Sequence, residues 1–379
     1  MILTADFHIH SPFSMAASKN TTPEMLTAAC RIKGLDILGS GDAFQPKWRK
    51  AWTDFDENAD DADGVTVLPT SEVDGKGKVH HLILMTDFSQ AEEIADRLRP
   101  YSSNIDKGGR PNVSLSGEAI LKIVHDCGAY CGPAHAFTPW TGMYGRVGSL
   151  RDCYGDEKPD FLELGLSADT SYGENIPELG GLPFLSNSDA HSAQLHKLGR
   201  EFNKIDTDSR KPQDIINAVL ENRIVLNAGL FPEEGKYNRT ACTKCYRQFS
   251  VAEAEECGGK CECGGKIKIG VRDRALSKSV PMESFDGKIL SRPPYLHIIP
   301  LAEIVTGVLK AASPNTKQCQ TLWSALVSEF GTEIAVLTEV PTERIAEINA
   351  PVADAVKKFR EGKIILHPGG GGKYGTFEI

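Results

Sequence analysis

Two short motifs of alternating polar residues constrain the fold of this chain most: His8-Ile9-His10 near the start, and Asp189-Ala190-His191 far along the sequence. Each follows a short apolar stretch, at residues 2–3 or 182–185, which is typical of a buried β-strand that emerges into a loop. Because side chains alternate between the faces of a strand, the two polar residues of each motif point the same way. Two such strand ends placed side by side would form a metal site.

Further carboxylates and imidazoles accompany the other predicted strands. Glu72 follows the apolar run 65–68, His80-His81 opens the run 82–85, and the ends of two more apolar runs carry Asp42 and His135. Parallel α/β folds and β/α barrels place their active sites at the C-terminal ends of strands. Imidazoles combined with carboxylates suit Zn²⁺, Mn²⁺ or Fe²⁺, whereas an all-oxygen set suits Mg²⁺. We expect at least two metals.

Turn and cap residues indicate the order of the elements. Thr22 as N-cap, Pro23 in the first turn and Gly34 after the last turn predict a helix, with a strand at 35–40. Helices are also predicted at 116–127 and 211–222, each followed by a strand, at 130–134 and 224–226. This alternation over about 230 residues is typical of a β/α barrel. Later helices are predicted at 316–330 and 351–360.

Four cysteines in two close pairs predict a zinc ribbon. They are Cys242, Cys245, Cys261 and Cys263, and four thiolates fit a tetrahedral structural Zn²⁺. Cys257 remains an alternative to Cys261 as the third ligand. The other five cysteines are scattered and are expected to be small core residues.

The order of the polar residues resembles the polymerase and histidinol phosphatase (PHP) family of metal-dependent phosphoesterases. The family's pattern falls on His8, His10, Glu72, His81, His135, Asp189 and His191. His81 is preferred to His80 because the family's histidine directly precedes an apolar strand. The resemblance implies a distorted seven-stranded (β/α)7 barrel with two or three active-site divalent metals, drawn from Zn, Mn, Mg or Fe.

The resemblance also implies roles for these residues. One ion would be held by His8, His10, Glu72 and Asp189, and a second by Glu72, His81 and His135. Glu72 would bridge the two ions. His191 and Asp42 would hold a third ion or protonate the leaving oxygen, so that Glu72, Asp189 and His191 carry the catalysis.

The rest of the chain is similar to the endonuclease Q branch of this family. The likeness includes Gly270-Val271-Arg272-Asp273-Arg274, the run 292–301 and the glycine-rich run 368–375, and it covers essentially the whole sequence. Those enzymes cut DNA on the 5′ side of a deaminated base (uracil, hypoxanthine or xanthine) or an abasic site and leave a 3′-hydroxyl. Two alternatives stay open: a small-molecule phosphoesterase acting on a nucleotide or sugar phosphate, and a non-catalytic nucleic-acid-binding protein.

The resemblance and the punctuation together divide the chain into a catalytic barrel at 1–235, the ribbon at 236–275 and a helical region at 276–379 with a glycine-rich tail. No apolar run approaches the ~20 residues that a membrane span needs, and no apolar leader is visible, so we expect a cytoplasmic protein that does not bind membranes. The net charge of −9 argues against non-specific coating of DNA. Damaged DNA is the expected partner; replication or repair factors are not identifiable from the sequence.

Candidate DNA contacts fall into two groups. A basic cluster directly after the ribbon is expected to contact phosphates, and it includes Lys266, Lys268, Arg272 and Arg274. A damaged base must leave the stack to be read, so aromatic residues on loops near the metals are candidates for the lesion contact. These are Phe13, Phe44, Trp140 and Tyr144, with Arg146 and Lys47 as candidates for stabilising charge in the transition state.

Overall fold

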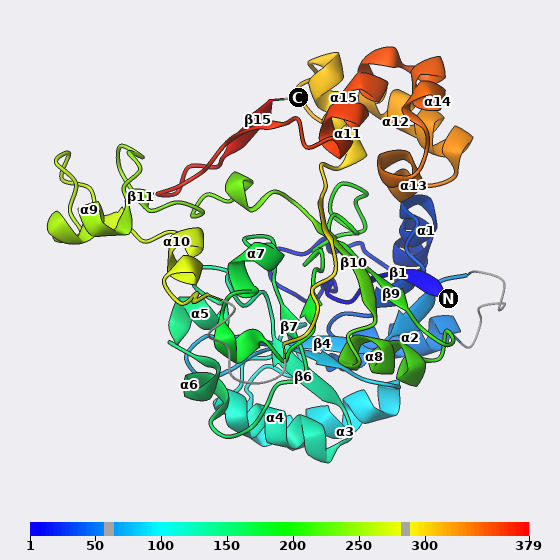
Figure 1. Ribbon diagram of the computed structural model, residues 1–379. Helices are drawn as coiled ribbons and strands as arrows, with labels where there is room; N and C mark the ends of the chain where they lie inside the picture. The colour runs from blue at the N-terminus through cyan, green and yellow to red at the C-terminus, as the bar shows by residue number, and fades with distance from the viewer. Residues whose placement is uncertain (57–63, 282–288, 379) are drawn as a thin grey trace.

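The computed structural model describes residues 1–56, 64–281 and 289–378, and it places a β/α barrel below a cysteine-rich lobe and a helical lobe (Figure 1). The strands of the barrel are β1 Ile2–Asp6, β2 Ile37–Gly39, β3 Thr66–Leu68, β4 Thr70–Asp74, β5 His80–Leu84, β6 Tyr130–Pro133, β7 Leu162–Glu163, β8 Phe184–Leu185, β9 Phe202–Asp206, β10 Ile224–Gly229 and β13 Tyr295–His297.

The barrel is distorted because its strands are not all parallel. Its largest sheet has the order β13-β10-β9-β1-β2-β3, in which β1 is parallel to β2 but antiparallel to β9. The strands β4, β5 and β6 pair antiparallel, and β7 and β8 form a short parallel pair. The interior is filled by apolar side chains such as Ala5, Leu82 and Ile205.

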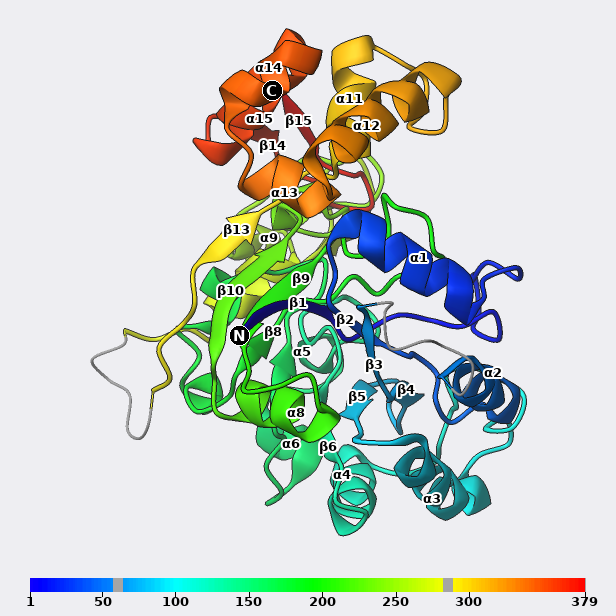
Figure 2. The same cartoon turned by 90° about the vertical axis from the view of Figure 1, so that its right-hand side faces the viewer.

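Helices cover the outside of the barrel, as Figure 2 shows for α1, α2, α3, α4 and α8. The predicted first helix is confirmed as α1, Pro23–Lys33: the Thr22 side chain accepts a hydrogen bond from the Met25 amide, and Gly34 ends the helix at φ 92°. The other α-helices of the barrel are α2 Pro46–Asp56, α3 Phe88–Leu98, α4 Gly117–Asp126, α5 Met143–Arg146, α6 Leu150–Tyr154, α7 Thr170–Gly173 and α8 Pro212–Leu220.

The cysteine-rich lobe projects from one side of the barrel (Figure 1). It contains β11 Ala241–Cys242, α9 Val251–Glu256, β12 Ile267–Lys268 and α10 Val271–Leu276. Its own buried apolar cluster is only Cys242, Ala254, Cys261 and Ile267. So small a core cannot stabilise a lobe by apolar burial alone, which favours a structural metal.

The chain returns to the barrel before the helical lobe begins, which differs from the expected boundary at residue 276. Strand β13 pairs in parallel with β10, and the helices start at Leu301. They are α11 Leu301–Leu309, α12 Lys317–Phe330, α13 Glu333–Thr338, α14 Thr342–Ile348 and α15 Ala350–Arg360. Across the described ranges, no helix is both long and apolar enough to cross a bilayer.

The C-terminal segment forms a hairpin where a glycine-rich tail was expected. Strands β14 Ile365–His367 and β15 Thr376–Glu378 pair antiparallel, and their connection packs on the cysteine-rich lobe. The Arg239 amide donates to the Gly369 carbonyl at 2.9 Å. A Cβ on Gly371, at φ 65°, would lie 2.2 Å from the Cys242 carbonyl oxygen, so this contact requires glycine.

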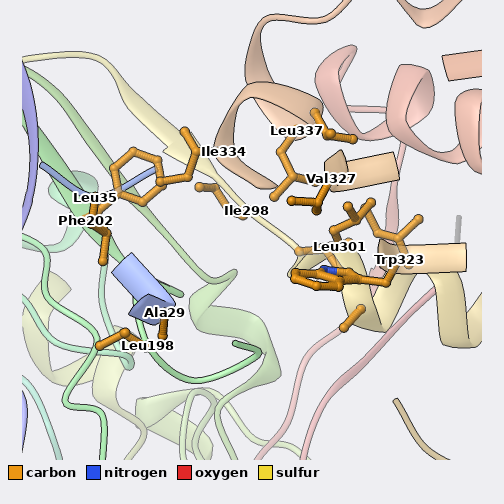
Figure 3. Packing of buried hydrophobic residues seen from close by; sticks show 14 of the residues in the cluster. Ala29, Leu35, Leu198, Phe202, Ile298, Leu301, Trp323, Val327, Ile334 and Leu337 are labelled. Atoms are coloured by element: carbon orange, nitrogen blue, oxygen red, sulfur yellow. The ribbon is translucent and has the colours of Figure 1, made fainter. Parts of the chain in front are cut away.

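The helical lobe shares one buried core with the barrel. Figure 3 shows Leu301, Trp323 and Val327 of the lobe in the same cluster as Ala29 of α1 and Phe202 of β9. The two parts are therefore packed together rather than linked by a mobile connection.

Candidate metal centre

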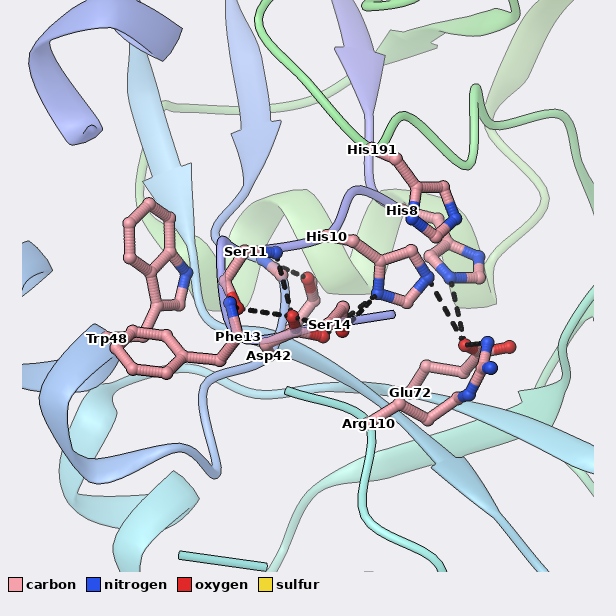
Figure 4. Close-up of polar contacts among 12 residues, drawn as sticks. His8, His10, Ser11, Phe13, Ser14, Asp42, Trp48, Glu72, Arg110 and His191 are labelled. Atoms are coloured by element: carbon pink, nitrogen blue, oxygen red, sulfur yellow. Dashed lines mark hydrogen bonds and ion pairs between the residues drawn. The ribbon is translucent and has the colours of Figure 1, made fainter. Parts of the chain in front are cut away.

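The two motifs of alternating polar residues lie side by side. Ile9 forms a parallel bridge with Ala190, and the His10 amide donates to the Ala190 carbonyl at 2.8 Å. This bridge brings His8, His10, Asp189 and His191 into one cluster. Figure 4 shows the two histidines of the first motif beside His191, with Glu72 facing them.

Three overlapping sets of side chains could each hold an ion, because the ligand atoms within each set lie within 4.8 Å of one another. The sets are His8, His10 and Glu72; Glu72, His80 and His135; and His10, Asp189 and His191. The shortest contacts are from Glu72 Oε1 to His80 Nδ1 at 2.7 Å and to His135 Nε2 at 2.8 Å. Glu72 and His10 each belong to two sets. Glu72 can bridge two ions through its two oxygens, whereas His10 has only Nε2 free and can serve one ion.

Two carboxylates behind the cluster orient its histidines. Glu163 lies 3.0 Å from His8 Nδ1, and Asp42 lies 3.0 Å from His10 Nδ1. The Nε2 atoms of both rings are buried without a hydrogen bond and face the cluster. A carboxylate on one ring nitrogen and a metal on the other is the usual arrangement of a histidine ligand, so the residues present fit divalent ions.

Glu163 is a site residue that the sequence analysis missed. It is buried at the end of β7, where it also accepts hydrogen bonds from Asn187 Nδ2 at 2.8 Å and the His135 amide at 2.7 Å. A single acid in the apolar run Phe161-Leu162-Glu163-Leu164 is the strand-end signal that identified Glu72. The same rule would have found it.

Asp42 occupies a different place from the one expected. Its oxygens accept from His10 Nδ1, from the Ser11 amide at 2.7 Å and from the hydroxyls of Ser11 and Ser14 at 2.5 and 2.8 Å. None of the three sets includes it. Asp42 therefore orients a histidine, and the expectation that it is a metal ligand is corrected.

The choice of His81 over His80 is also corrected. In the antiparallel pair β4 and β5, Asp74 lies opposite His80, and Val73 lies opposite His81. Glu72 is two residues from Asp74 and shares its face, so His80 points toward Glu72 while His81 points away. The His81 ring is buried, with Nδ1 2.9 Å from the Tyr154 hydroxyl.

The buried histidines and carboxylates of the cluster shift one another's pKa values. Burial alone would lower the pKa of His8 and His10, but neighbouring carboxylates raise the pKa of both well above the usual histidine value. Burial would raise the pKa of Glu72 and Asp189, but the surrounding imidazoles lower the pKa of both well below the usual range. The carboxylates are therefore anionic and ready to bind cations.

The backbone is strained at several of these positions. Asp42, His135 and Asp189 adopt φ angles of 49°, 31° and 47°, and Trp140 adopts 80°. Residues other than glycine rarely take positive φ, and such strain gathers at functional sites.

Three of the aromatic candidates for the lesion contact lie elsewhere. Phe44 is fully buried, and Tyr144 is 3% exposed with its hydroxyl 2.7 Å from Glu178 Oε1. Phe13 points away from the cluster toward Trp48 (Figure 4), beside a second cavity that Lys47 also lines. Phe44 and Tyr144 are thus core residues, and Phe13 and Lys47 are not placed at the cluster.

Trp140 is exposed and held by basic residues. Its side chain is 49% exposed, Lys268 Nζ lies 3.5 Å from its ring centroid, and Arg146 Nε donates to its carbonyl. Arg274 Nη1 reaches the Tyr144 carbonyl at 3.4 Å. Two members of the basic cluster therefore lie against the loop that carries Trp140, while Lys266 is exposed and Arg272 half-buried.

A cavity of about 570 Å³ opens beside the metal cluster. Its inner wall includes His135, Glu163 and Asp189, and its outer wall includes Trp140, Lys236, Tyr237 and Tyr374. Tyr237 meets Trp140 edge to face, with centroids 5.9 Å apart. Tyr237 and Tyr374 carry no sequence signal, because the fold alone brings the ribbon and the C-terminal hairpin to this loop.

The four predicted cysteines come together in the ribbon. Sγ of Cys242 lies 3.5 Å from Sγ of Cys263, and Sγ of Cys245 lies 3.7 Å from Sγ of Cys261. Thiolates bound to one tetrahedral zinc lie about 3.8 Å apart. Cys257 is exposed and does not belong to the group.

Comparison with known proteins gives two family models and two relatives. A model described as PHP-associated matches residues 178–224, and one described as the MJ0043 C-terminal domain matches residues 300–363. MJ0043 of Methanocaldococcus jannaschii is 45% identical over 254 residues, which cover 65% of this chain but only 31% of that protein. YqxK of Bacillus subtilis is 32% identical over 402 residues, covering 99% of this chain and 98% of that protein.

The fold, the cluster and the PHP-associated match together define a protein with a PHP domain. The lesion-specific endonuclease PfuEndoQ from Pyrococcus furiosus matches 100% of this chain and 96% of its own, at 42% identity and a TM-score of 0.94. An endonuclease Q complex with a 27-mer duplex that carries an abasic lesion at the active site matches at 42% identity and a TM-score of 0.91, over 100% and 97%. The chain belongs to the endonuclease Q family.

Proposed function

We propose that this protein is a DNA repair endonuclease that hydrolyses the phosphodiester on the 5′ side of a deaminated base or an abasic site. The observation that carries the proposal is the likeness, over the whole chain, to lesion-specific endonuclease structures, one of them with abasic DNA at its active site. The metal cluster and the adjoining cavity supply the chemistry and the space that such an activity needs.

Two or three divalent ions, of Zn, Mn, Mg or Fe, would occupy the overlapping sets, with Glu72 shared between two of them. Bound there, they would polarise the phosphate and make a water nucleophilic near neutral pH. Glu163 and Asp42 hold the rings of His8 and His10 in place. His191, 29% exposed at the rim, would either bind the third ion or, with two ions only, protonate the leaving 3′ oxygen. A structural zinc would occupy the four cysteines.

The cavity is the proposed place of the damaged nucleotide. A base that leaves the duplex needs an apolar surface to stack on, and Trp140, whose side chain is 49% exposed, lies at the outer wall. Lys268 and Arg274 lie against the loop that carries Trp140. Together with Lys266 and Arg272 they would contact the DNA backbone. The overall negative charge is compatible with this local basic track.

The test is cleavage of labelled duplexes that carry one uracil, hypoxanthine or abasic site, with Mn²⁺ or Mg²⁺, beside an undamaged duplex. Glu72→Ala and Asp189→Ala should abolish cutting while DNA binding persists, because each removes a ligand without opening the core. Asp156→Ala, an exposed aspartate of the surface, is the matched control and should cut normally. Normal cutting by either ligand variant would contradict the site.

The alternatives predict other outcomes. A small-molecule phosphoesterase would hydrolyse p-nitrophenyl phosphate and leave every duplex intact. A non-catalytic binding protein would bind the duplexes and cut none under any metal.

A further inference from the structure

We propose that Arg110 is a catalytic residue that binds the non-bridging oxygens of the scissile phosphate. This inference rests on the proposed endonuclease function and names a residue of the same site. Arg110 lies in the loop between η2 (Arg99–Tyr101) and α4, in the stretch Gly108-Gly109-Arg110-Pro111, where no sequence pattern indicates a role.

The Arg110 guanidinium reaches the bridging carboxylate of the cluster. Its Nη1 lies 2.9 Å from Glu72 Oε2, the oxygen that also faces His10 Nε2 at 3.3 Å (Figure 4). The side chain is 29% exposed, so it stands between the buried cluster and solvent. Within the described ranges, Glu72 is its only hydrogen-bond partner, and the guanidinium keeps further donors for an incoming acceptor.

The backbone of this loop is fixed against the cluster. The Gly109 amide donates to the Phe13 carbonyl at 3.2 Å, and the Asp74 amide donates to the Pro111 carbonyl at 2.9 Å. A Cβ on Gly109 would lie 2.1 Å from Asp42 Oδ2, so only glycine permits this approach. The loop therefore presents Arg110 at a defined position.

Divalent ions and Arg110 compete for the same carboxylate. Ions held by His8, His10, His80 and His135 would draw on both oxygens of Glu72, which weakens its pairing with Arg110. An arriving phosphodiester brings negative charge next to Glu72 and Asp189, and a planar guanidinium binds phosphate oxygens in pairs. Neither cation expected from the sequence fills this role, since Arg146 binds the Trp140 carbonyl and Lys47 lines another cavity.

In the reaction, the oxygen of a water forms a bond to phosphorus and the bond from phosphorus to O3′ breaks. The bonding electron pair stays on O3′, which takes up a proton, and the water gives up its proton to solvent or a nearby base. Charge gathers on the non-bridging oxygens in the transition state. Donors aimed at that charge accelerate such reactions by about 10²–10³-fold.

The experiment compares wild type with Arg110→Met and Arg110→Lys, as full chains with checked folding and metal content. We expect the single-turnover rate on a uracil duplex to fall about 10²-fold in the methionine variant. The lysine variant should recover part of the rate, because it keeps the positive charge but lacks the paired N–H donors of the guanidinium. KM should change little, because many other contacts hold the duplex.

A second readout needs no turnover. The metal-loaded protein is titrated with nicked product duplexes that differ only in the 5′-phosphate at the nick. Wild type should prefer the phosphorylated duplex, and Arg110→Met should lose about tenfold of that preference.

Four outcomes would overturn the inference. An unchanged preference would do so, as would a rate restored by excess Mn²⁺, which would show that Arg110 only helps Glu72 to hold metal. If Arg110→Met does not fold, the lysine variant decides, because wild-type turnover and preference in it would exclude a bidentate contact. A wild-type protein that cuts no lesion duplex would contradict the endonuclease function itself, and the inference with it.

Discussion

His80 and His81 are neighbours in the chain but have different surroundings, so substitutions should separate their roles. His80→Asn should lower the content of bound divalent metal and abolish cleavage, because His80 Nδ1 contacts Glu72 at 2.7 Å. His81→Asn should keep the metal but lose the contact with Tyr154, which would cost about 1–3 kcal/mol of unfolding free energy. Elemental analysis and urea denaturation measure the two effects. Metal loss in the His81 variant alone would contradict this geometry.

Glu234, at the cavity wall, should make stability depend on pH. Burial and the nearby Glu303 raise the pKa of its carboxyl to about 7. A carboxyl whose pKa is raised on folding stabilises the protein below its unfolded value near 4.5 and loses that contribution as pH rises through about 7. Glu234→Gln should therefore be more stable than wild type at pH 8, by on the order of 2 kcal/mol, and nearly equal at pH 4.5. Equal unfolding curves at both pH values would contradict the shift.

The site was partly predictable because strand ends are visible in a sequence. His8, His10 and Glu72 follow apolar runs, and the structure gathers them in one set. The choice between His80 and His81 required the antiparallel register of β4 and β5, which depends on pairing that no local pattern encodes. Arg110 was invisible for the same reason: its loop has no periodicity, and only the fold brings it to Glu72.

At the scale of elements, the ribbon should depend on its metal. Cys245→Ser should release about one zinc and destabilise the cysteine-rich lobe, because the apolar core of that lobe is too small to keep it folded without the metal. Cys257→Ser is the matched control, since this thiol is exposed outside the cluster, and it should keep the zinc. Elemental analysis decides; zinc loss from the Cys257 variant would reassign the third ligand.

The loop that carries Trp140 should separate the reading of a lesion from cutting. If the indole stacks on an extruded base, Trp140→Ala should lose on the order of 1–3 kcal/mol of transition-state stabilisation on a uracil duplex. An abasic site has no base to stack on, so its rate should change less, unless the indole fills the gap left in the duplex. Rates on both substrates, beside undamaged DNA, distinguish these roles. Unchanged rates on both would mean that selectivity lies elsewhere.

Local signals predicted helices better than they predicted sheet pairing. The caps Thr22 and Gly34 define α1, and Ser116 caps α4 through the Ala119 amide, as expected. The strand β13 was missed because it is short and joins the barrel from beyond the ribbon. Its partner β10 lies far back in the sequence, so its pairing is set by the tertiary fold.

For the whole molecule, the helical lobe and the catalytic barrel form one structural unit. Their common core contains Leu198, from the segment that follows His191, and Trp323 of α12 (Figure 3). The same segment is tied to the barrel interior, because the Gly199 amide donates to Asp6 Oδ2 at 3.1 Å. The lobe therefore packs against the segment that leads away from the metal cluster.

A buried ion pair at this junction gives the last prediction. Lys33 Nζ lies 2.8 Å from Glu333 Oε1 and donates to the Leu195 carbonyl at 2.8 Å, while Trp323 Nε1 donates to Glu333 Oε2. Glu333→Gln leaves the Lys33 ammonium buried without a counter-charge, so the unfolding free energy should fall by about 3–5 kcal/mol.

Glu333→Gln should also speed amide hydrogen exchange at residues 192–199, because the Lys33 ammonium that donates to the Leu195 carbonyl loses the carboxylate that holds it in position. Lys33→Met combined with Glu333→Leu removes both charges at similar volume and should recover most of the stability. It cannot restore the bond to Leu195, so exchange in the segment should stay fast in the double variant. Slow exchange there would mean that the ion pair stabilises the lobe without holding the segment beside His191.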